Sequence, residues 1–144
     1  MDRFIVGSRA FFMGMEGFNP KDEDILCIKD DIDSTNPYTR QVHFKNKCVF
    51  EWKRMPLEEL IEINLKRNDG MVLGKFLVPE FAKEMGMKIE DLKKLKPLVN
   101  RLDDKHLYEK IIYDAYLENN EFVLNEEQRT NAYEEYRRVR NNNK

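Results

Sequence analysis

Hydrophobic and polar residues follow two different patterns along this chain. Over the first third, short runs rich in β-branched and aromatic residues predict strands at 3–6, 22–28, 41–44 and 48–52. The last two runs flank Lys45-Asn46-Lys47 and predict a β-hairpin. From residue 56 onward, apolar residues recur every three or four positions, which is typical of amphipathic helices.

The helical part divides at its prolines, glycines and capping residues. Helices are expected to start at Pro56 and stop at Asn68-Asp69-Gly70, to span 71–85 with an irregularity at Pro79, and to span 89–102 with a kink or a break at Pro97. Two further helices are expected, one after Asp103 or Asp104 and one at the capping sequence 125–128. The chain is therefore predicted to be α+β (α/β-like), with a small mixed sheet in 1–55 and a helical region, 56–144, packed on that core.

Composition and charge bear on which partners the protein binds and in which compartment it is found. The 144 residues carry 25 Lys and Arg against 27 Asp and Glu, a net charge of −2, so the whole-chain charge gives no case for nonspecific nucleic-acid binding, although a local basic face stays open. Cys27 and Cys48 fall in predicted strands and are interpreted as small buried hydrophobes in a reducing compartment. There is no apolar run of membrane-spanning length and no signal-peptide core, so we expect a cytoplasmic protein without a membrane partner.

Chemistry is indicated by Gly7-Ser8 at the end of the first strand and by Asp22 and Asp24 at the start of the second. Because strand side chains alternate between faces, Asp22 and Asp24 point the same way, with Cα atoms ~6.5–7 Å apart. Two carboxylates so placed can share divalent ions, and two such ions ~3.5–4 Å apart clamp both oxygens of a phosphoryl displacement. A Gly-Ser turn offers close backbone approach and a hydroxyl to a phosphate. The alternative is that Lys21 to Asp24 is a solvated loop leading into an ordinary buried strand, and that Gly7-Ser8 is an ordinary turn.

The residues Phe4 to Ala10, followed by Asp22 to Leu26, resemble the nucleotidyltransferase family of the DNA polymerase β type, especially its minimal members. The resemblance covers roughly the first third of the chain. It implies a short helix over 9–15 whose N-terminus points at the phosphates, and a nucleoside monophosphate moved from an NTP, such as ATP, to an acceptor with release of pyrophosphate. It also implies two Mg²⁺ ions, or Mn²⁺ in their place, held by Asp22 and Asp24.

The same resemblance implies a third catalytic and metal-binding carboxylate on a later strand, and Glu51 is the acid available there. Val49, Glu51 and Lys53 share one face of their predicted strand. If that face meets the Asp22 and Asp24 face, Glu51 joins them; the alternative is an exposed acid on an edge strand, paired with Lys53 or Lys45. Arg9 could reach a triphosphate with its planar fork, or form a surface salt bridge.

Three functions stay open on the sequence. The first is a nucleotidyltransferase whose acceptor, a small molecule, a protein side chain or an RNA end, is not encoded in any motif. The second is a non-catalytic nucleotide- or protein-binding module of the same fold, such as an antitoxin-like partner. The third is an unrelated α+β interaction domain. Residues 80–95 have helix-turn-helix spacing, but Glu84, Glu90 and Asp91 would repel DNA, so DNA binding is not expected.

Overall fold

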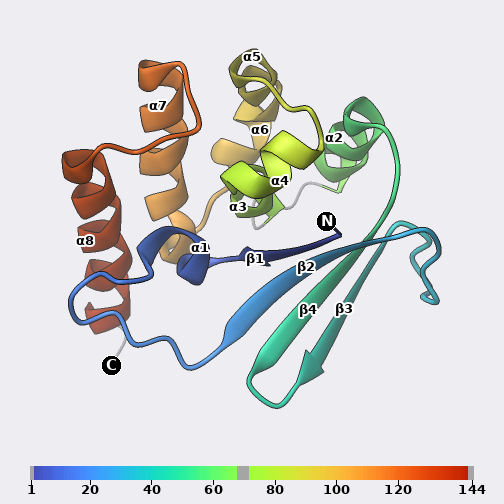
Figure 1. The fold of residues 1–144 in the computed structure, drawn as a ribbon, viewed down its shortest axis with the longest axis horizontal. Coiled ribbons are helices and arrows are strands. Elements are labelled where there is room, and N and C mark those ends of the chain that lie inside the picture. Colours follow the sequence, from blue (N-terminus) through green and yellow to red (C-terminus); the bar gives the residue numbers. More distant parts are fainter. Residues whose placement is uncertain (1, 68–71, 143–144) are drawn as a thin grey trace. The chain divides into compact units, whose positions relative to one another are not determined.

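The computed structural model describes residues 2–67 and 72–142 and divides the chain into two compact units, Met1–Pro56 and Leu57–Lys144 (Figure 1). The first unit holds all the described strands, and the second is helical. The predicted α+β class with a helical C-terminal region is confirmed. The predicted ranges, 1–55 and 56–144, differ little from these two units.

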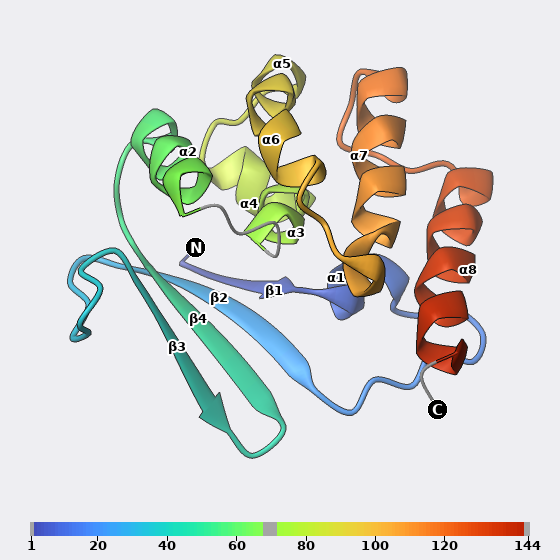
Figure 2. The same cartoon turned by 180° about the vertical axis from the view of Figure 1, so that it is seen from behind.

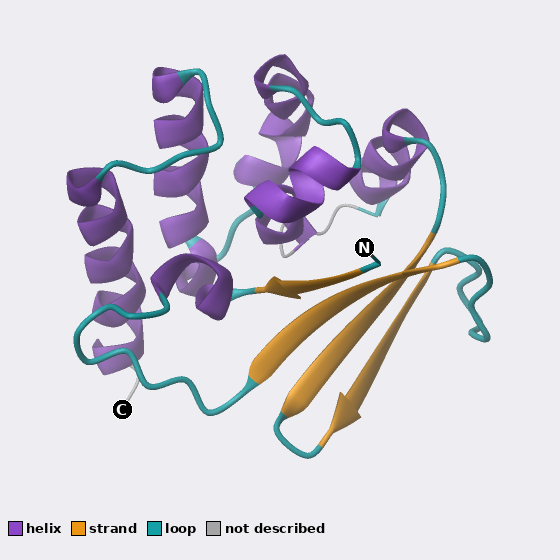
Figure 3. Ribbon diagram, viewed as in Figure 1, coloured by secondary structure: helices purple, strands orange, loops and turns teal. Residues whose placement is uncertain are grey.

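The first unit is built on a four-stranded mixed sheet (Figure 3). Its strands are β1 (Arg3–Val6), β2 (Glu23–Lys29), β3 (Thr39–Phe44) and β4 (Lys47–Lys53). The order is β1-β2-β4-β3; β2 and β4 run parallel, and the other two pairings are antiparallel. The predicted hairpin is therefore β3–β4, and β1 and β3 are the two edges of the sheet (Figure 2).

The two faces of this sheet differ in character. Residues paired across the ladder share a face, so one face carries the buried residues Phe4, Val6, Leu26, Ile28 and Trp52; we call it the Trp52 face. The other carries Ile5, Ile25, Val49 and Val42 in one row and Arg3, Cys27, Glu51 and Arg40 in the next; we call it the Arg40 face. Burial of large apolar side chains on the Trp52 face supplies the main stabilising free energy of the sheet.

The second unit consists of short helices and two long ones. They are α2 (Leu57–Lys66), α3 (Leu73–Phe76), α4 (Pro79–Glu84), α5 (Ile89–Leu92), η2 (Lys93–Leu95), α6 (Lys96–Val99), η3 (Asp104–His106), α7 (Tyr108–Asn119) and α8 (Glu126–Asn142). Where one irregular helix was expected over 71–85, the structure has α3 and α4, because Pro79 begins a helix and holds Val78 extended before it. The predicted stop at Asn68-Asp69-Gly70 and start at Met71 lie outside the described residues.

Caps and a tyrosine-rich core define the two long helices. α7 ends at Asn120 in the left-handed conformation, and α8 begins at the expected capping pair, in which Gln128 N donates to Asn125 Oδ1 at 2.8 Å. Buried Tyr113 donates its hydroxyl to the Leu92 carbonyl at 2.8 Å, as expected of a packing residue. Within the described residues, every helix is too short or too polar to cross a bilayer.

Candidate functional site

The Gly-Ser turn and the Asp-x-Asp segment lie side by side in the first unit. β1 ends at Val6, which pairs with Asp24 in the antiparallel register of β1 and β2. Gly7 follows, and Ser8 begins the short helix α1 (Ser8–Phe12). Helix α1 was expected over 9–15; it ends earlier because Met13 takes an extended conformation. The ladder thus brings together two segments that are well separated in sequence.

Gly7 is required at this turn for two reasons. Its backbone angles, φ 72° and ψ −159°, belong to a region that essentially only glycine occupies. A Cβ atom at Gly7 would also collide with the carboxylate oxygen Oδ2 of Asp24. The half-buried Asp24 carboxylate therefore lies directly against the turn, in contact with its backbone.

Arg9 fixes the start of β2 to helix α1. Its Nε donates a hydrogen bond to the backbone carbonyl of Asp22 at 3.1 Å, and its guanidinium lies 3.8 Å from the Glu23 carboxylate. The guanidinium thus forms the salt bridge that was the alternative to triphosphate binding. Asp22 is exposed, directly before β2, and β2 itself opens at Glu23. Arg9 positions the two aspartates relative to the Gly-Ser turn.

The expectation that Glu51 converges with Asp22 and Asp24 is wrong. Asp24 pairs with Cys48, whereas Glu51 pairs with Cys27, so Glu51 lies on the Arg40 face and Asp24 on the Trp52 face. Glu51 is only 8 % exposed. Its carboxylate pairs with Lys29 Nζ at 2.5 Å and with Arg40 Nε at 3.8 Å. The alternative, an exposed acid on an edge strand paired with Lys53 or Lys45, is also wrong. β4 is a central strand, and the cations paired with Glu51 are Lys29 and Arg40.

Hydrophobic matching between β2 and β4 explains this register. Asp24 shares its face with Leu26 and Ile28, and the apolar side chains of β4 that complete that layer are Phe50 and Trp52. Pairing these rows leaves Glu51 on the opposite face. The acid is retained there because two cations compensate its burial.

The register adds His43, which the sequence did not single out. Asp24, Cys48 and His43 form one row across β2, β4 and β3 on the Trp52 face. Two strand spacings separate the Cα atoms of Asp24 and His43 by ~9–10 Å. His43 is exposed, and its Nε2 lies 3.1 Å from Gln41 Nε2.

The carboxylates available for a cation are therefore Asp22 and Asp24. Across residues 2–67 and 72–142, no three His, Cys, Asp or Glu side chains gather as a metal-binding group. Mg²⁺ does not need one, since it is commonly held by one or two carboxylates while substrate phosphates and water complete its octahedron. Asp24 against the glycine turn, with Asp22 two residues before it, fits a Mg²⁺–nucleotide complex, and Glu51 does not belong to that set.

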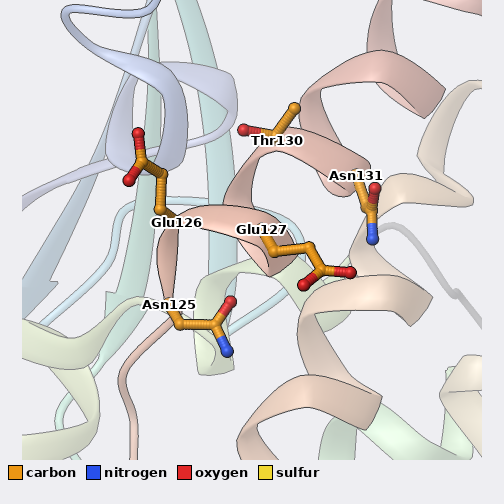
Figure 4. Close-up of a pocket in the computed structure, with 5 residues that line it drawn as sticks. All are labelled: Asn125, Glu126, Glu127, Thr130 and Asn131. Atoms are coloured by element: carbon orange, nitrogen blue, oxygen red, sulfur yellow. The ribbon is translucent and has the colours of Figure 1, made fainter.

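A separate hollow of about 600 Å³ lies at the start of α8 in the second unit. It is lined by Asn125, Glu126, Glu127, Thr130 and Asn131 (Figure 4). Figure 4 shows the carboxylates of Glu126 and Glu127 pointing to different sides of the helix, so they do not converge on a common ligand. Acids in the first turn are accounted for by their favourable interaction with the helix dipole.

Comparison with protein-family models, with curated proteins and with solved structures found no match for this chain.

Proposed function

We propose that the protein is a metal-dependent nucleotidyltransferase, which moves a nucleoside monophosphate from an NTP to an acceptor. The observation that carries the proposal is the contact between the Gly7 turn and the Asp24 carboxylate. Phosphate groups are bound by backbone N–H groups that can approach them closely, and Mg²⁺ is commonly held by carboxylate oxygens. In the first unit the Gly7 backbone and the Asp24 carboxylate lie in contact, so the two kinds of group are available at one place.

Each residue of the site has a role in this proposal. The Gly7–Ser8 turn binds the β and γ phosphates, and Asp22 and Asp24 hold Mg²⁺, or Mn²⁺ in its place. The bound cation neutralises phosphate charge and orients the reacting groups. Arg9 acts as a positioning residue, because its guanidinium contacts the Asp22 carbonyl and the Glu23 carboxylate and so fixes the start of β2 beside α1.

A second candidate is a domain that binds the nucleotide without turning it over. Glu51 favours it: the resemblance assigns the third carboxylate to the cation that activates the attacking hydroxyl, and here that carboxylate lies on the other face of the sheet. Both candidates share the Mg²⁺–nucleotide site and differ only in turnover.

Binding is tested by calorimetric titration of the full chain with Mg²⁺–ATP and the other NTPs. Asp24→Asn keeps the side-chain shape and removes the charge, so we expect it to abolish Mg²⁺-dependent binding. The matched control is Asp31→Asn, an exposed acid in the connection after β2, which should bind like the wild type. Wild-type protein that binds no NTP, or equal losses in both variants, would contradict the site.

Turnover is tested with radiolabelled NTP, Mg²⁺ or Mn²⁺, and a panel of acceptors: aminoglycosides, tRNA and the protein itself. Transfer by the wild type that disappears in Asp24→Asn supports the transferase. Tight NTP binding with no pyrophosphate release in any mixture favours the binding module instead.

A further inference from the structure

The Arg40 face is the opposite side of the sheet from Asp24, and its chemistry is different. Its residues, row by row across the register, are Glu23, Lys47 and Phe44; Ile5, Ile25, Val49 and Val42; Arg3, Cys27, Glu51 and Arg40; and Lys29 and Lys53. Tyr38 extends this last row, because its carbonyl accepts a hydrogen bond from Lys53 N at 2.8 Å. The face therefore combines basic, aromatic and aliphatic side chains.

Three large side chains at the edges of this face are exposed, whereas Ile25 near its centre is buried. Phe44 is 63 % exposed, Ile5 53 % and Tyr38 41 %. Tyr38 directly precedes the edge strand β3 and Phe44 is its last residue, so the two lie six residues and ~20 Å apart, with Arg40 between them on the same face. Lys45 Nζ lies 5.7 Å from the centre of the Phe44 ring, so cationic charge is already gathered beside that ring.

The face is positively charged although the whole chain is not. The basic residues are Arg3, Lys29, Arg40, Lys47 and Lys53, and the acids are Glu23 and Glu51. Glu51 is buried and already paired with Lys29 and Arg40. In a chain of net charge −2, five basic residues against two acids on one face produce a local basic surface.

We propose that the Arg40 face binds single-stranded nucleic acid. Unstacked bases of a single strand can stack on exposed aromatic rings of a sheet, while neighbouring Lys and Arg side chains contact the phosphates. A duplex would not present its bases to Phe44 and Tyr38, so single strands are the chemistry that uses both features. The inference stands apart from the nucleotide site, which lies on the Trp52 face.

The test is the fluorescence anisotropy of labelled oligo(U) and oligo(dU) with the full chain, at several salt concentrations. Phe44→Ala should weaken binding roughly 5- to 150-fold, the loss associated with one stacked base. Phe44→Leu, which keeps apolar bulk without a ring, should lose a similar factor, and Phe44→Trp should retain affinity. Lys47→Ala should weaken binding to all sequences and reduce the salt slope by about 1.

Two matched controls lie off this face. Met13→Ala removes an equally exposed apolar side chain of the same unit, and Lys83→Ala removes an exposed lysine of α4; both should bind like the wild type. Affinity for oligo(U) over oligo(dU), which differ only in the 2′-hydroxyl, or the reverse, identifies the preferred sugar. The proposal is overturned if neither oligonucleotide binds at low salt, if duplex competes as well as single strand, if Phe44→Leu binds normally, or if the controls lose as much affinity as Phe44→Ala.

Discussion

A glycine makes room for a carboxylate at two places in this protein, once in each unit. In the first unit Gly7 lies against Asp24, and in the second unit Gly74 of α3 lies against Glu109 of α7. A Cβ atom at Gly74 would lie 2.9 Å from Glu109 Oε2. In both places the carboxylate occupies the space that a Cβ atom would take, but the two acids differ in how far they are buried.

Glu109 is 3 % exposed, whereas Asp24 is half-buried at the surface turn. Burial raises the pKa of Glu109 to about 8, against the opposing effects of Lys75, the Tyr108 side chain and the Gly74 backbone N–H. Among the described residues, its Oε1 accepts no hydrogen bond. The buried Glu109 therefore affects the pH dependence of folding stability, whereas the half-buried Asp24 beside the glycine turn is accessible to a ligand.

The largest expected effect follows from Glu109. Its pKa is about 8 in the folded chain against an ordinary value of 4.5, so between these values the folded state holds a proton that the unfolded state has lost. The contribution of this group to stability is therefore greatest below pH 4.5 and falls as pH rises toward 8, by on the order of 5 kcal/mol. Urea denaturation across this pH range measures the fall.

Glu109→Gln should flatten that pH dependence, because an amide does not titrate. Glu118→Gln, an exposed acid on the same helix, is the control and should keep the wild-type profile. A Glu109→Gln profile as steep as that of the wild type would mean that another group carries the dependence.

The next effect concerns the turn itself. Gly7→Ala should cost roughly 3 kcal/mol or more, since it combines backbone strain with a collision against Asp24. Gly14→Ala isolates the strain alone: φ is +88° there, but the added Cβ meets nothing within 4 Å, so we expect a cost of about 1 kcal/mol. Thermal denaturation of both variants gives the difference, and equal costs would show that the carboxylate is not held against Gly7.

The smallest effect separates Glu51 from the nucleotide site. Glu51→Gln should lower stability by about 1 kcal/mol, because Lys29 and Arg40 are both solvent-accessible and can rehydrate. Binding of Mg²⁺–ATP should be unchanged within a factor of two. A loss of nucleotide binding comparable to that of Asp24→Asn would restore Glu51 to the site and contradict the register.

Local signals predicted most of the fold. The strand 3–6 and the hairpin 41–52 follow from β-rich runs around a tight turn, and the start of α8 follows from the reciprocal pairing of Asn125 and Gln128. The region 71–102 is more divided than expected: Pro79 starts a separate helix, α4, and residues 89–99 form α5, η2 and α6, with Pro97 in the first turn of α6.

The site was only partly predictable for a different reason. Strand alternation correctly separates Glu51 from Trp52 on β4, but β2 is apolar on both faces, with Ile25 and Cys27 on one and Leu26 and Ile28 on the other. Alternation within single strands therefore could not decide which face of β4 meets Asp24. That decision needs the register, and the register also places His43 in the row of Asp24.

The central claim is that a nucleotide and its cation bind where Gly7 meets Asp24. Amide NMR of the ¹⁵N-labelled chain, titrated with ATP and a trace of Mn²⁺, tests it directly, because the paramagnetic ion broadens only signals near its site. The account predicts that the Gly7, Ser8 and Asp24 amides broaden at the lowest Mn²⁺ concentration, and that this broadening disappears in Asp24→Asn. Broadening centred on Glu126 and Glu127, or no broadening at all, would contradict it.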